Sequence, residues 1–174
     1  MAKAPDGVDL QSARDLKGRG AECWIRRALV ALFAVVPVLA LFNVFGQSAS
    51  VASVSTDAVK LTVRSPEHGR GGLLYEVRFT IVAHQDIKNA TLALGGGWAN
   101  GLTINTIEPS PTDETSDNGN LSFQLGPIDA GSAFVLHMDF QINPTTVGSR
   151  KQQVALLDGD TVLASMTRHL TVYP

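Results

Sequence analysis

The sequence is poor in cysteine, aromatic residues and charge. Among 174 residues there is one cysteine, Cys23, while aromatic residues make up 6% and charged residues 17%. Because a single thiol cannot form an intrachain disulfide, the fold cannot depend on disulfides for its stability. The net charge of −2 gives no basic surface for nucleic acid, which we exclude as a partner. The length excludes a TIM barrel and a multi-domain enzyme.

Motifs of catalysis and metal binding are also missing. The sequence has no G-x-S-x-G, H-x-H or H-E-x-x-H pattern. The four histidines lie on separate predicted elements: His68, His84, His137 and His169. We therefore predict that the protein is not an enzyme and that it has no catalytic residues, no metal site and no cofactor.

One long apolar run is present, at residues 28–45 (ALVALFAVVPVLALFNVF), without any charged side chain. A helix of this length spans roughly 27 Å, close to the hydrocarbon thickness of a bilayer. Pro37 would break a soluble helix but is tolerated in a membrane helix. A soluble core helix is the alternative, but it should have a polar face, and this run has none. The sequence predicts a transmembrane helix at 28–45.

The basic residues around this helix predict its orientation. Arg26 and Arg27 directly precede it, whereas the first basic residue after it is Lys60. Since basic residues are retained on the cytoplasmic side, Arg26 and Arg27 should determine the topology, with a cytoplasmic N-terminus and an extracytoplasmic C-terminal part. Membrane lipid around this helix is therefore a predicted partner of the protein.

The predicted organisation has four parts. Residues 1–27 form a flexible cytoplasmic tail, 28–45 the helix, 46–56 a small and polar linker, and 57–174 a folded extracytoplasmic domain. A cleaved signal peptide is the alternative for the first parts, with a cleavage site among the small residues 48–52. The long apolar run and the long, mildly basic segment before it favour an uncleaved anchor.

After residue 56 the apolar residues recur with a period of two, which is typical of half-buried strands. The clearest predicted strands have these inward faces: Tyr75, Val77, Phe79, Ile81 and Ala83; and Phe134, Leu136, Met138, Phe140 and Ile142. Glycine-containing turns separate the runs, and Asp158-Gly159 predicts a hairpin between two of them. The domain is therefore expected to be all-β, an immunoglobulin-like antiparallel β-sandwich of seven or eight strands.

The order of the runs adds a family resemblance. The segment DAVKLTVRSPE, the glycine-led RGGLLYEVRFTIVAH and IKNATLAL are followed by LSFQLGPIDAGSAFVLHMDFQINP, with corners at Gly126-Pro127 and Ala130-Gly131. Residues 57–173 thereby resemble immunoglobulin-like bacterial surface domains of the CARDB kind. The whole arrangement also resembles small single-pass membrane proteins of actinobacteria. The resemblance implies a non-catalytic surface module with protein-facing or spacer roles, and it implies no functional residues.

Two loops contain candidate interaction residues. The glycine-rich loop LALGGGWANG contains Trp98 and Asn100, which we consider for contact with a membrane-protein partner. Trp98 has the equal alternative of capping the sandwich core. The loop 108–120 is rich in carboxylates, so an envelope domain that binds Ca²⁺ or a small ligand, or a hydrolase, is the alternative function. The main prediction is a protein-interaction module or an accessory subunit of a membrane complex.

Overall fold

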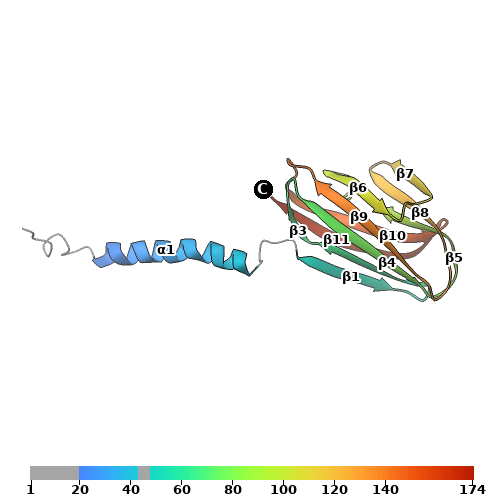
Figure 1. Ribbon diagram of the computed structural model, residues 1–174, viewed down its shortest axis with the longest axis horizontal. Helices are drawn as coiled ribbons and strands as arrows, with labels where there is room; N and C mark the ends of the chain where they lie inside the picture. Colours follow the sequence, from blue (N-terminus) through green and yellow to red (C-terminus); the bar gives the residue numbers. More distant parts are fainter. Residues whose placement is uncertain (1–19, 43–47) are drawn as a thin grey trace, which may run out of the picture. The chain divides into compact units, whose positions relative to one another are not determined.

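The computed structural model describes residues 20–42 and 48–174, as one helix and a separate unit of eleven strands (Figure 1). The helix is α1, Gly20–Leu41. The strands are β1 Ala49–Ser55, β2 Val59–Pro66, β3 His68–Arg70, β4 Leu74–Ala83, β5 Ile87–Leu94, β6 Leu102–Glu108, β7 Asp113–Asp117, β8 Asn120–Ile128, β9 Ala133–Ile142, β10 Gly148–Asp158 and β11 Thr161–Tyr173.

Helix α1 is 22 residues long and contains Pro37. It begins eight residues before the predicted run, because no proline or glycine interrupts residues 21–36 and Glu22 lies in the favourable first turn. The predicted end, residues 43–45, lies outside the described residues. Residues 21–41 are long and apolar enough to cross a membrane, a property that membrane anchors and signal sequences share.

Two sheets form the sandwich. The first, sheet A, has the strand order β1-β2-β4-β9-β6, and the second, sheet B, has the order β3-β11-β10-β5-β8-β7. The strand pairs are antiparallel, except that β3 runs parallel to β11. The immunoglobulin-like, all-β fold predicted from the sequence is confirmed.

The alternating apolar residues form the core between the sheets. In β4 and β9 the predicted inward faces are buried, with only Phe134 partly accessible. The predicted hairpin is also present: β10 and β11 pair from Asp158 and Thr161 onward, and Gly159 has a φ of 56°. Each large side chain buried in this way contributes about 1.5–3 kcal/mol to folding.

Three strands were not expected. Residues 49–55 were predicted as linker, but they form β1, which pairs with β2 over seven residues. Residues 113–117 were predicted as part of a loop, but they form the edge strand β7. Together with the three-residue β3 they raise the number of strands from the predicted seven or eight to eleven. None of their apolar side chains is large and buried, so the sequence has no apolar alternation there.

Candidate functional site

Trp98 lies in the core and not on the surface. Its side chain is 0% exposed, and its ring centroid lies 5.8 Å from that of Phe79 and 5.2 Å from that of Phe140. Its indole Nε1 donates a hydrogen bond of 3.0 Å to the carbonyl of Gln153. Of the two alternatives for Trp98, the structure therefore supports capping of the core, and a direct contact with a partner is contradicted.

The glycines beside Trp98 allow the loop to cross strand β10 closely. A Cβ atom added at Gly97 would lie 1.7 Å from the carbonyl oxygen of Lys151, and one at Gly95 would lie 2.9 Å from Cβ of Gln153. Only glycine fits at such distances. These glycines therefore serve packing of the loop, which carries Trp98 into the core.

The remaining sequence-predicted residues lie apart from one another. Asn100 is exposed in the glycine-rich loop, where its carbonyl accepts a hydrogen bond from Arg150. Arg26 and Arg27 are exposed on α1, and the Arg27 guanidinium lies 5.7 Å from the ring centroid of Trp24. Asn100 is therefore accessible to a partner. That Arg26 and Arg27 determine the orientation of the helix in the membrane stays a prediction.

The carboxylates of residues 108–120 do not converge on one point. Asp113, Glu114 and Asp117 lie on the exposed strand β7, where successive side chains point to opposite faces. Asn118 and Gly119, with φ values of 49° and 78°, form the tight turn from β7 to β8. Throughout residues 20–42 and 48–174 no three His, Cys, Asp or Glu side chains are grouped to hold a metal ion. The geometry therefore gives no support to the calcium-binding alternative.

A hydrogen-bonded group of charges lies on the outer face of sheet A. His137 Nδ1 lies 2.9 Å from Glu76 Oε1, and Arg78 Nη2 lies 3.3 Å from the same oxygen. The His137–Glu76 contact joins β9 to β4, whereas Arg78 and Glu76 both lie on β4. The hydrogen bond from His137 lowers the pKa of Glu76.

A buried arginine, which the sequence reasoning missed, lies between the sheets. Arg168 on β11 is 5% exposed and donates to the carbonyls of Ser65 at 2.8 Å and of Ser50 at 3.4 Å. Burial lowers its pKa, and the nearby charge of Glu67 opposes this. The alternation that buries Ala164, Leu170 and Val172 extends to position 168 and was the available signal.

The polar part of the core continues from Arg168 to Tyr75 and Gln152. Burial raises the pKa of the Tyr75 phenol, and the neighbouring Gln152 amide and then the charges of Arg150 and Arg168 oppose this only in part. In the described part of the chain, Tyr75 Oη and Gln152 Nε2 have no hydrogen-bond partner. This region contributes less to stability than the apolar centre, because buried polar groups without partners are costly.

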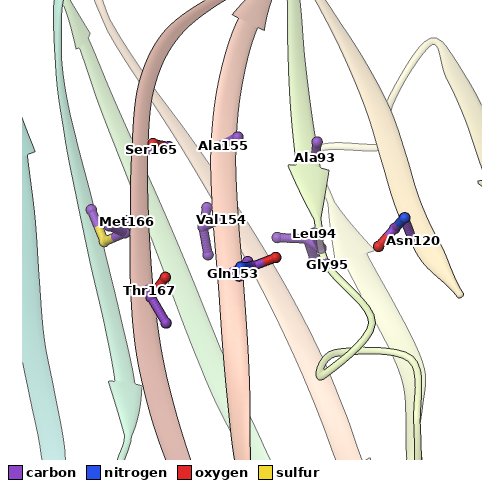
Figure 2. Close-up of a pocket in the computed structure, with 10 residues that line it drawn as sticks. All are labelled: Ala93, Leu94, Gly95, Asn120, Gln153, Val154, Ala155, Ser165, Met166 and Thr167. Carbon is purple, nitrogen blue, oxygen red and sulfur yellow. The ribbon is translucent and has the colours of Figure 1, made fainter.

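An open groove of about 610 Å³ lies on the outer face of sheet B. Figure 2 shows that its lining side chains come from four neighbouring strands, β11, β10, β5 and β8. Its floor contains three small side chains in direct register on β5, β10 and β11, which are Ala93, Ala155 and Ser165. Ser122 and Thr115 continue this row on β8 and β7, beyond the lining of the groove. The floor is uncharged and lets another main chain approach closely.

Amide and hydroxyl side chains border this floor on one side. Gln153 and Thr167 are register partners on β10 and β11, and Asn120 lies at the start of β8 (Figure 2). The Gln153 side chain lies against Gly95, whose missing Cβ makes room for it. The border offers donors and acceptors of hydrogen bonds without charge, so the groove suits a neutral partner segment better than an ionic ligand.

Comparison with known proteins gives similarities of fold only. No family model and no curated protein matches the chain. Among solved structures, CaCohA2 from Clostridium acetobutylicum is 17% identical, with 69% of this chain and 94% of that chain covered and a TM-score of 0.47. A CARDB domain from Pyrococcus furiosus, in complex with di-metal ions, is 16% identical, with coverages of 68% and 97% and a TM-score of 0.39.

A third similar structure is AvmM, which catalyses macrocyclization in alchivemycin A biosynthesis. It is 7% identical, with 74% of this chain and 90% of that chain covered and a TM-score of 0.42. A solution structure of the same CARDB domain is also among the similar structures. At these identities and TM-scores the likeness is one of β-sandwich architecture, and it transfers no partner, ligand or residue role.

Proposed function

We propose that the chain is a single-pass, membrane-anchored β-sandwich that binds a protein partner outside the cytoplasm, as a non-catalytic module or an accessory subunit. Helix α1 is the proposed anchor, uncleaved, with Arg26 and Arg27 on its cytoplasmic side. Residue 42 is followed by strand β1 after only six residues, so the sandwich stays close to other proteins of the same membrane. Such tethering raises the effective concentration for a membrane partner.

The proposed binding surface is the groove on sheet B, and the row of small side chains in register carries the proposal. Ala93 and Ala155 are the central members of this row, at the strand pair β5–β10. Short side chains there let a partner segment approach the sheet, while Gln153 and Asn120 supply directional hydrogen bonds. The groove brings together no nucleophile, base and acid, which supports binding without catalysis.

The test places one large charged side chain on the floor of the groove. Ala155→Arg in the full-length chain is compared with Ala133→Arg, a matched change at an exposed position of sheet A. Each protein is purified from membranes in mild detergent, and the proteins that purify with it are quantified. We expect a stoichiometric membrane-protein partner with the wild type and with Ala133→Arg, and a loss of at least tenfold with Ala155→Arg.

The controls separate the anchor from the groove. Replacement of residues 28–41 by an unrelated membrane helix should keep the partner if the groove is sufficient. Equal recovery with Ala155→Arg and wild type, at equal thermal stability of both proteins, would show that the partner binds elsewhere. Purification of the wild-type protein alone in every mild detergent would contradict the accessory-subunit role.

A further inference from the structure

The turns of the sandwich gather at two opposite ends. We define the proximal end as the one at which β1 begins. There Ala49 pairs with Pro66, and Arg70 pairs with Tyr173 at the end of β11. Gly72 N–H donates to the carbonyl of Ile142, which adds the end of β9. The connections β2–β4 and β9–β10 therefore meet the start of β1 and the end of β11 at this end.

The distal end contains the turns β1–β2, β4–β5, β8–β9 and β10–β11. Backbone hydrogen bonds join them: His84 N–H donates to Ala58, and Gly131 N–H donates to Ala83. Asp158 accepts hydrogen bonds from the backbone N–H groups of Lys88 and Asn89. The two ends are thus well defined within the sandwich itself.

Exposed apolar side chains concentrate at the proximal end. Within residues 48–174, seven large apolar side chains are exposed, and four of them lie in the proximal connections or at the end of β11. These four are Leu73 at 44% exposure, Leu74 at 58%, Val147 at 58% and Tyr173 at 39%. The other three are single valines on strands β1, β9 and β11. Grouped exposed apolar residues mark a surface that another phase or protein covers.

The charges are distributed with the same polarity. The proximal end has five basic residues, Arg64, Arg70, Arg78, Arg150 and Lys151, and three acidic residues, Glu67, Glu76 and Asp139. The distal end has two basic residues, Lys60 and Lys88, and the following five acidic ones: Asp57, Asp86, Asp129, Asp158 and Asp160. The sandwich is therefore basic and apolar at one end and acidic at the other.

We infer that the proximal end is a lipid-contacting surface that lies on a bilayer with anionic headgroups. Leucine and tyrosine side chains partition into the interfacial region, and basic residues are attracted to anionic lipid. The acidic distal end is repelled from the same surface, so the two ends favour one orientation. This inference rests on the proposed anchoring, because seven peptide steps from residue 42 to residue 49 extend at most about 25 Å.

The experiment uses the full chain reconstituted into vesicles of phosphatidylcholine, with or without a third of phosphatidylglycerol. In a Cys23→Ser background, a single polarity-sensitive fluorophore is attached at Thr145→Cys, an exposed proximal position, or at Ala130→Cys, an exposed distal position. We expect a blue-shifted emission and quenching by lipid-borne quenchers at position 145 only, stronger with phosphatidylglycerol.

Matched substitutions test the contact itself. Val147→Ser and Val162→Ser remove the same side chain at nearly equal exposure, 58% and 56%, from the proximal end and from the distal start of β11. In an Arg70→Gln background, we expect Val147→Ser to reduce the quenching at position 145 at least twofold, and Val162→Ser to leave it unchanged. Equal emission at positions 145 and 130 in both vesicle types would overturn the inference.

Two further outcomes separate this inference from the proposed function. A chain that leaves the vesicles in an alkaline carbonate wash is not anchored, which contradicts the proposed function and the inference with it. In the second outcome the chain stays anchored, but the emission of the fluorophore at position 145 shifts only when a copurified membrane protein is added. This outcome contradicts the lipid contact and leaves the proposed anchoring intact. In that case the proximal end binds protein.

Discussion

Removal of the Trp98 side chain is expected to destabilise the sandwich strongly. The side chain is fully buried between the rings of Phe79 and Phe140, at the centre of the core. Trp98→Ala removes an aromatic side chain that its neighbours cannot replace, and such changes cost about 3–5 kcal/mol. This loss is a large part of the free energy of unfolding of a typical domain, which is about 5–15 kcal/mol.

Trp98→Phe provides the matched variant. It keeps a ring against Phe79 and Phe140 but removes the hydrogen bond from Nε1 to the carbonyl of Gln153. That carbonyl also accepts a hydrogen bond of 2.9 Å from Gly95 N–H, so no buried acceptor loses its only partner. The cost should therefore be about 1–2 kcal/mol, from a net hydrogen bond and a smaller cavity.

The measurement is urea unfolding of the full-length protein in detergent, followed by the β-sheet signal in circular dichroism. The midpoint should fall for both variants, with a slope close to that of the wild type. A loss of less than about 1 kcal/mol for Trp98→Ala would refute the core position, because the removal of a buried aromatic side chain costs more. Equal losses for the two variants would refute the argument from Gly95.

Two other predictions concern backbone packing and the buried charge. Gly97→Ala should unfold the protein or lower its melting temperature markedly, because the new Cβ would overlap the Lys151 carbonyl. Gly96→Ala should change the melting temperature little, because its new Cβ would lie 3.6 Å from the nearest atom, the carbonyl oxygen of Gly119. Equal melting temperatures of the two variants would contradict the close approach at Gly97. Arg168→Met should accelerate amide hydrogen exchange several-fold in β1, because it removes the donor to the carbonyl of Ser50. Unchanged exchange in β1, or a uniform increase in every strand, would show that Arg168 does not hold this strand.

The sequence was sufficient to predict strands that have one buried face and one exposed face. Strands such as β4 and β9 have one face in the core and one in solvent, so their side chains alternate and their positions were predicted. The hairpin at Asp158-Gly159 was predicted because Gly159 takes the positive φ that the tight turn needs. The helix was predicted from composition alone, since its apolar run has no polar face.

The sequence was insufficient where backbone pairing stabilises a strand. Strand β1 contains alanine, serine and valine, and β7 contains acidic and hydroxyl side chains, so neither shows a core-facing pattern. Their hydrogen bonds to β2 and β8 involve main-chain groups, which every sequence provides. Edge strands of this kind become visible only when the register of the sheet is known.

The groove could not be predicted for a related reason. Ala93, Ala155 and Ser165 are far apart in the sequence, and the turns and a bulge at Leu156–Leu157 determine which residues become neighbours. Residues of this kind are common on any strand and have no motif. Trp98 was the more conspicuous residue in the sequence because it is large and lies in a loop, yet the fold turns it inward.

The position of Trp98 nevertheless links the core to the groove. Its indole and the Gly95 N–H both bind the Gln153 carbonyl, while the Gln153 side chain borders the groove on the opposite side of β10. Loss of Trp98 would thus loosen the backbone that positions Gln153, and partner binding would weaken without any contact between Trp98 and the partner. Ala155→Arg leaves these hydrogen bonds intact, so only this variant tests the groove as a contact surface.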